Sequence, residues 1–261
     1  MDLPGKIVLI TGASGGIGAA MARSFHARGA LLSLMARSAD KLESVARETK
    51  AVFTVGDVTS DQDRRLAVEA TLAAHGRIDV LVNNAGAGMY VPAWRADMAQ
   101  VRGLYELNYF APLELIQLVV PEMRKRGGGM IVNMSSIAGK VSLPWFSNYT
   151  ASKFALCAVT DGLRIELAPF NIRCMTVCPG YVKTNFQDNS LASRPPDRLW
   201  RFKQFVLSPE QCAEAAVKGI EREKRTVIVP ATGRLLHLAY SIFPSAVDLF
   251  LARIYRGLKM D

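Results

Sequence analysis

Short apolar runs alternate along the chain with longer stretches in which apolar residues recur at helical spacing. Residues 6–11 (KIVLIT) are apolar on both faces, as is typical of a strand buried inside a parallel sheet. Residues 17–28 follow with an apolar stripe of helical period, and the same order then repeats. Repeated strand–helix–strand units predict an α/β fold: a doubly wound, Rossmann-type parallel sheet of about seven strands with helices on both faces.

This alternation assigns most of the chain to elements. It predicts strands at residues 6–11, 30–36, 51–58, 78–86, 130–136, 172–180 and 225–231, and helices at 17–28, 40–49, 60–75, 98–126, 149–168 and 208–222. Ser60 is the expected N-cap of the third helix, because its hydroxyl can accept a hydrogen bond from an amide of the first turn. No linker or low-complexity segment separates these elements, so we expect one domain over residues 1–261.

Two regions fall outside the alternation. Residues 185–206 are polar and contain proline, yet they include Trp200, Phe202 and Phe205, so we expect a lid over a substrate. Residues 233–261 form an apolar tail in which Val247, Phe250, Leu251, Ile254 and Leu258 recur at helical spacing between basic residues. The apolar run before Pro244 is too short to span a bilayer. Such a helical extension could lie on anionic lipid, cover the core or form a subunit interface.

Composition narrows the class of protein. Half of the 261 residues are hydrophobic and the net charge is +9, but no run of five like charges occurs, so we expect no nucleic-acid partner. The four cysteines fit no zinc spacing, and we expect buried thiols and no metal. The first residues lead directly into a strand without the pattern of a signal peptide, which favours a cytoplasmic protein.

A glycine-rich turn, TGASGGIG, connects the first strand to the first helix. Glycines allow the backbone to turn sharply and to approach a pyrophosphate closely, with the helix amides facing its negative charge. A glycine turn without a ligand is the alternative. The residues expected to bind a dinucleotide here are Gly12, Ser14, Gly16, Ile17 and Gly18.

The end of the second strand indicates which dinucleotide is preferred. An acidic residue there would bind the adenosine 2′-hydroxyl of NAD, whereas a basic residue accommodates the 2′-phosphate of NADP. The strand ends in Ala36, followed by Arg37 and Ser38, which favours NADP(H) over NAD(H). Arg37 could also be an ordinary solvated loop charge, and Gly15 stands where NADP-dependent relatives often carry a basic residue.

The chain resembles the short-chain dehydrogenase/reductase family, in its short, single-domain branch. The motifs that carry the resemblance occur in the family's order and spacing: TGASGGIG, DV at 57–58, NNAG at 83–86, Asn108, IVNMSS at 131–136, YTASK at 149–153 and PG at 179–180. They cover about residues 5–230. The resemblance implies hydride transfer between a nicotinamide cofactor and a carbonyl or secondary alcohol, and a homodimer or homotetramer.

The resemblance also implies catalytic roles for Asn108, Ser136, Tyr149 and Lys153. Tyr149 would exchange a proton with the substrate oxygen, and Lys153, one turn along the same helix face, would lower the tyrosine pKa and hold the nicotinamide ribose. Ser136 would orient the substrate oxygen, with Ser135 as the alternative. Asn108 would hold a water in a proton relay, although it could equally bond a neighbouring carbonyl.

Further cofactor contacts follow from position in the family pattern. Asp57 and Val58 are expected at the adenine, and Asn84 and Gly86 at the ribose. Residues expected on the nicotinamide side are Pro179, Gly180, Val182 and Thr184.

The substrate side has an apolar composition. Leu143, Trp145, Phe146 and Tyr90 are the expected substrate contacts, which favours a lipophilic substrate such as a keto-lipid, a keto-acyl compound or a steroid-like compound. These side chains could instead pack against the core or a partner subunit. A small polar hydroxy acid or sugar is the alternative substrate. A non-catalytic protein that senses NADP(H) or acts as a scaffold is the alternative function.

Overall fold

The computed structural model describes residues 1–186, 190–192 and 206–255. Trp200, Phe202 and Phe205 of the predicted lid and Leu258 of the predicted tail therefore lie outside the described residues. The strands are β1 Ile7–Thr11, β2 Leu31–Ala36, β3 Val52–Val55, β4 Val80–Asn83, β5 Gly129–Met134, β6 Ile172–Pro179 and β7 Thr226–Val229. They form a sheet in the order β3-β2-β1-β4-β5-β6-β7, and all six neighbouring pairs are parallel. The predicted doubly wound sheet is confirmed.

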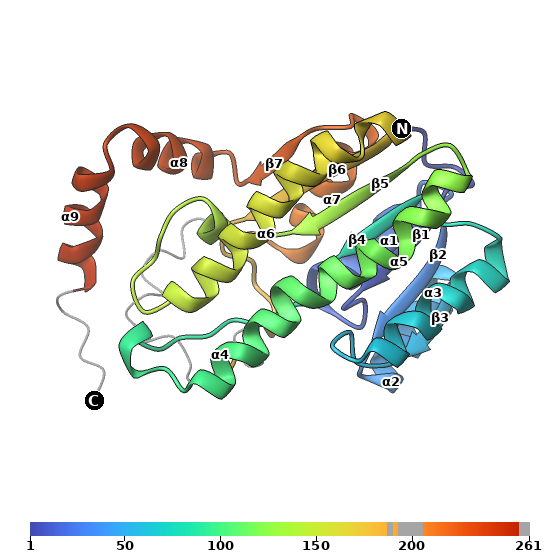
Figure 1. Cartoon of the computed structure of the whole chain (residues 1–261), viewed down its shortest axis with the longest axis horizontal. Helices are drawn as coiled ribbons and strands as arrows, with labels where there is room; N and C mark the ends of the chain where they lie inside the picture. Colours follow the sequence, from blue (N-terminus) through green and yellow to red (C-terminus); the bar gives the residue numbers. More distant parts are fainter. Residues whose placement is uncertain (187–189, 193–205, 256–261) are drawn as a thin grey trace.

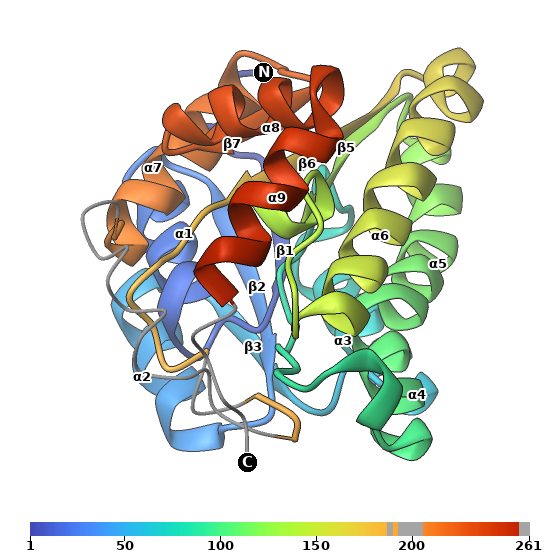
Figure 2. The same ribbon diagram turned by 90° about the vertical axis from the view of Figure 1, so that its left-hand side faces the viewer.

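Helices cover both faces of the sheet (Figures 1 and 2). They are α1 Gly16–His26, α2 Ala39–Thr49, α3 Asp61–His75, α4 Met98–Tyr105, α5 Ala111–Lys125, α6 Ser147–Glu166, α7 Pro209–Glu221, α8 Thr232–Ile242 and α9 Pro244–Tyr255. The cluster of α1, α2 and α7 includes Val8 and Ile10 of β1, whereas the cluster of α3 and α5 includes Leu9. Alternate side chains of one strand therefore belong to the cores on opposite faces, as the pleat requires.

The predicted helix 98–126 is divided. α4 ends at Tyr105, a π-helical segment covers Glu106–Phe110, and α5 begins at Ala111. Pro112 explains the change, because it has no amide hydrogen to donate to the carbonyl of Asn108 and its ring would crowd that carbonyl in a regular α-helix. The interruption therefore falls on a predicted catalytic residue, where π-helical turns are often found.

The predicted C-terminal extension is helical and forms an arm. α8 follows β7, and α9 turns away from α8 at Phe243, so that the two helices project beside the end of the sheet (Figure 1). No single described helix has the length and hydropathy needed to cross a membrane. α8 and Pro244–Ile254 meet that criterion only when taken together, and they are bent by 117°.

Candidate active site

The carboxyl ends of the strands open onto a cavity of about 840 Å³. β1 and β4 are neighbours here and their chains continue to opposite sides of the sheet, which is where doubly wound folds bind ligands. The predicted site residues that line the cavity are Gly12, Ser14, Gly16, Ile17, Arg37, Ser38, Asp57, Val58, Asn84, Gly86, Tyr90, Ser136, Leu143, Phe146, Tyr149, Lys153, Pro179, Gly180, Val182 and Thr184. Gly18, Asn108 and Trp145 do not line it.

The turn after β1 depends on glycine at three positions, Gly12, Gly16 and Gly18. Gly12 and Gly16 have positive φ angles of 65° and 53°, which other residues rarely adopt. A Cβ on Gly18 would lie 2.3 Å from the carbonyl oxygen of Gly12. The side-chain amide of Asn84 braces the turn by donating to the carbonyl oxygens of Thr11 and Gly12, at 2.9 and 3.2 Å.

This turn fits the diphosphate of a dinucleotide. Ser14 of the turn lines the cavity, together with Gly15, Gly16 and Ile17 at the start of α1. The amides of a helix start have no partner within the helix and attract anions. Gly18 does not line the cavity, but its lack of a side chain lets α1 approach Gly12 and Asn84 closely.

The cavity end near β2 and β3 contains two cations. Arg37 lies 3.6 Å from the carboxylate of Asp57, measured from Nη1 to Oδ2. Burial alone would raise the pKa of Asp57, but hydrogen bonds from the amide and hydroxyl of Thr59 and the charge of Arg37 hold it below its ordinary value. Lys41, in the first turn of α2, also lines the cavity. The sequence analysis missed Lys41, which lies beyond the motif residues at the end of β2.

Tyr149 and Lys153 lie on α6 and are 5% and 3% exposed, so both polar groups are withdrawn from solvent. The Lys153 Nζ donates a 3.0 Å hydrogen bond to the carbonyl of Met134 and lies 5.8 Å from the centre of the Tyr149 ring. Ser136 follows β5, and its hydroxyl accepts a hydrogen bond from the amide of Ala138 at 3.1 Å. The side chain of its neighbour Ser135 points elsewhere, donating to the carbonyl of Lys153.

Burial acts against the ionised form of both α6 residues. It raises the pKa of Tyr149 well above its ordinary value, although a hydrogen bond with Ser136 opposes the rise. It lowers the pKa of Lys153 to about 8. Tyr149 is therefore a protonated phenol at neutral pH, which is the form that can donate a proton.

Asn108 is completely buried behind the cavity. Its Oδ1 accepts from the amide of Ala87, and its Nδ2 donates to the carbonyl of Ala87 and to the hydroxyl of Ser152, all within 3.1 Å. Asn108 therefore bonds a neighbouring carbonyl, that of Ala87 in the loop after β4, as well as a hydroxyl on α6. Ser152, which precedes Lys153 in α6, was missed by the sequence analysis.

Aromatic rings form the wall beside Tyr149. The Phe146 ring stacks between Tyr90 and Tyr149, with centroid distances of 4.1 Å to each. Phe186 meets the Tyr149 ring edge-on at 5.8 Å. Trp145 has a φ of 61°, and its carbonyl accepts a 2.8 Å hydrogen bond from the amide of Val91, so it shapes the loop that carries Phe146.

The C-terminal arm completes this wall. Leu236 of α8 and three residues of α9, Phe250, Leu251 and Ile254, line the same cavity. The helical period of the tail identified the apolar face of α9 but not the surface that this face covers. The tail therefore covers part of the site.

The four cysteines, Cys157, Cys174, Cys178 and Cys212, are all buried and free, as expected from their apolar neighbours. Among the described residues, no group of three His, Cys, Asp or Glu side chains is placed to hold a metal ion.

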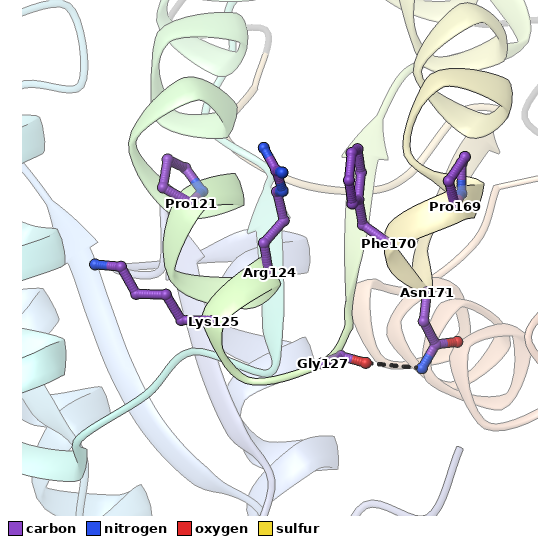
Figure 3. A pocket seen from close by; sticks show the side chains of 7 residues that line it. All are labelled: Pro121, Arg124, Lys125, Gly127, Pro169, Phe170 and Asn171. Carbon is purple, nitrogen blue, oxygen red and sulfur yellow. Dashed lines mark hydrogen bonds between the residues drawn. The ribbon is translucent and has the colours of Figure 1, made fainter.

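A second hollow, of about 620 Å³, lies at the opposite end of the sheet, where β5 and β6 begin (Figure 3). Arg124 stacks over the Phe170 ring at 3.9 Å, and the side-chain amide of Asn171 donates to the carbonyl of Gly127. None of the predicted site residues line this hollow.

Comparisons with known proteins identify the family of the chain. Residues 6–195 match the family model described as short chain dehydrogenase. The chain is 34% identical to dehydrogenase/reductase SDR family member 7B of Danio rerio, over 89% of this chain and 79% of the relative. It is also 34% identical to the ketoacyl reductase HetN of Nostoc sp., over 97% of this chain and 89% of the relative.

Among solved structures, a short chain dehydrogenase from Burkholderia cenocepacia in complex with NADP superposes with a TM-score of 0.81. The two chains are 27% identical, and the superposition covers 96% of this chain and 99% of the Burkholderia chain. The family match, the parallel sheet and the cavity at its switch point lead to one conclusion. The chain belongs to the short-chain dehydrogenase/reductase family and is an NAD(P)-dependent oxidoreductase.

Proposed function

We propose that the protein reduces a lipophilic carbonyl compound with NADPH. The observation that carries the substrate class is the wall beside Tyr149, where Tyr90, Leu143 and Phe146 meet the apolar face of α9 in one cavity. Such a wall favours an alkyl or ring system over a sugar, because sugar hydroxyls buried there would lack hydrogen-bond partners. The name of the HetN relative, a ketoacyl reductase, is consistent with this substrate class.

The proton step is assigned to Tyr149. Its phenol donates a proton to the carbonyl oxygen, while Ser136, which acts to lower the pKa of Tyr149, holds that oxygen. Lys153 binds the nicotinamide ribose, and Asn108 fixes the loop after β4 against α6 through Ala87 and Ser152. The bound nicotinamide supplies the hydride.

NADPH preference is proposed from Arg37, Ser38 and Lys41, which gather at one end of the cavity. The Asp57 carboxylate pairs with Arg37 near that end. A carboxylate paired with a cation repels the 2′-phosphate of NADPH less than an unpaired carboxylate would. We expect Arg37→Ala to weaken NADPH binding by about tenfold and NADH binding by less than about twofold, because only NADPH carries the 2′-phosphate. Fluorescence titration of both cofactors measures this difference.

Arg47→Ala is the matched control, since Arg47 lies near the other end of α2 and pairs with Glu43. It should leave both affinities unchanged. Equal losses for NADPH and NADH in Arg37→Ala would contradict the assignment of cofactor preference.

Oxidation of NADPH across a series of ketones of increasing chain length tests the substrate class. We expect kcat/KM to rise with each added methylene until the cavity is filled, by about threefold per group. A preference for small hydroxy acids or sugars would favour the polar alternative. Tight NADPH binding without turnover of any carbonyl would favour the sensing or scaffold alternative.

A further inference from the structure

The outer surface of the α8–α9 arm is apolar. Six of its large side chains are more than half exposed, with exposed fractions between 51% and 69%: Leu235, Leu238, Ile242, Phe243, Leu249 and Phe250. Elsewhere in the described part of the chain, the large apolar side chains that are more than half exposed are Trp94, Met98 and Ile165. Apolar side chains gathered in this way mark a surface that contacts something else.

The exposed residues lie on defined helix faces. Leu235, Leu238 and Ile242 are spaced i, i+3, i+7 and form one stripe on α8. On α9, Leu249 faces away from Val247 and Leu251, which are buried. The arm therefore has an inner face that closes the cavity and an outer face without a described partner.

Charge and shape favour a lipid surface as the occupant of the outer face. Arg234 and Arg253 are exposed on the arm, Asp248 is the one acidic residue in its described part, and the whole chain carries a net charge of +9. Basic residues beside an apolar helix face are typical of helices that lie in the plane of an anionic membrane. The bend of 117° means that the apolar side chains are carried by two differently directed helices.

We propose that the outer faces of α8 and α9 dock on an anionic membrane surface and hold the cavity against the bilayer. Because Phe250 is 56% exposed and also lines the cavity, it stands at the edge between the two faces of α9. A lipophilic substrate dissolved in the bilayer then reaches the cavity along α9 without crossing water. Docking stands on its own, whereas delivery of the substrate rests on the proposed function.

Co-sedimentation with vesicles tests docking on the full chain. We compare phosphatidylcholine vesicles with vesicles that also contain phosphatidylserine, and we expect binding at least about tenfold tighter to the anionic vesicles at low salt. Leu235→Glu combined with Ile242→Glu should weaken that binding by at least about tenfold, because it removes two inserted side chains and adds two negative charges. Both residues are exposed and neither lines the cavity, so the fold and the site are retained.

Leu66→Glu is the matched control, because Leu66 on α3 is 50% exposed and lies away from the arm. It should bind vesicles as the unmodified protein does. Equal vesicle binding by the double variant, or no binding by the unmodified protein, would overturn the proposal. Light scattering without vesicles tests whether a second copy of the chain covers the outer face instead. A dimer that dissociates in the double variant, together with no vesicle binding, would assign the outer face to that second copy.

Delivery is tested with two ketones. The double variant should lose at least about tenfold of its NADPH oxidation with a long-chain ketone dissolved in anionic vesicles, and retain its rate with a short, water-soluble ketone. Equal rates on the vesicle substrate would overturn delivery. If no ketone supports turnover in solution, the proposed function fails while vesicle binding still decides docking.

Discussion

The two walls of the cavity are built in opposite ways. On the cofactor side, the residues stand at strand ends and their positions are set by backbone turns and by hydrogen bonds such as those of Asn84 to the glycine turn. On the substrate side, loops and α9 contribute mainly apolar side chains such as Phe146 and Leu251. Under the proposed function, the reaction depends on backbone geometry that tolerates little change, whereas substrate choice depends on side chains that can be exchanged.

The largest effect should come from the place where the two walls meet. Tyr149→Phe removes the proton donor but retains the ring that stacks on Phe146, so we expect kcat to fall by about 10² to 10⁴-fold. NADPH affinity should change by less than about twofold. Turnover assays and fluorescence titration on the same preparation measure both, and full activity in the variant would remove Tyr149 from the mechanism.

Lys153 should show that the cofactor wall is built at the expense of stability. Because its pKa is lowered to about 8 from 10.5, the unfolded chain binds a proton that the folded protein lacks between these pH values, and stability rises with pH across that window. Lys153→Met lacks this penalty, so at pH 7 we expect it to be inactive yet more stable by about 2 kcal/mol, after loss of the hydrogen bond to Met134.

Denaturant unfolding at pH 7 and pH 9.5 measures the difference. The advantage of the Lys153 variant should shrink at the higher pH. A variant that is less stable than the unmodified protein at pH 7, or an advantage that does not depend on pH, would contradict the role of burial.

The glycine turn offers a matched pair of substitutions. In Gly18→Ala the new methyl group would collide with the Gly12 carbonyl, and we expect a loss of about 1–3 kcal/mol in the free energy of unfolding. Gly15→Ala meets nothing within 4 Å and has an extended backbone, so its stability should be unchanged. Thermal unfolding without cofactor measures both, and similar losses in the two variants would mean that close packing is not the reason for Gly18.

The smallest effect is expected on the substrate wall. Leu251→Ala shortens one side chain of α9 without touching Tyr149, and should raise KM for long-chain ketones by about three- to tenfold. The rate with a short ketone should stay the same. A change of kcat with every ketone would show that the two walls are not separable.

The same contrast explains how much could be predicted. The sheet and the glycine turn were predictable because burial on both faces and left-handed backbone angles leave local signals in the sequence. The contact of α9 with the cavity was not, since its apolar period is equally suited to a membrane, a partner or the protein itself. Trp145 was expected at the substrate from its type, but it does not line the cavity, and its positive φ angle is a feature that residue type does not predict.

The π-helical segment Glu106–Phe110 has a consequence for how this protein can change. Such a segment contains one residue more than an α-helix of the same length along its axis, and deleting that residue would remove the wide turn. The deletion would also rotate everything on one side of it by about 100° relative to the other, and Asn108 would turn away from Ala87 and Ser152. Selection for a well-formed helix alone would remove the extra residue. Its presence therefore indicates that the position of Asn108, and not helix stability alone, has been selected at this point of the chain.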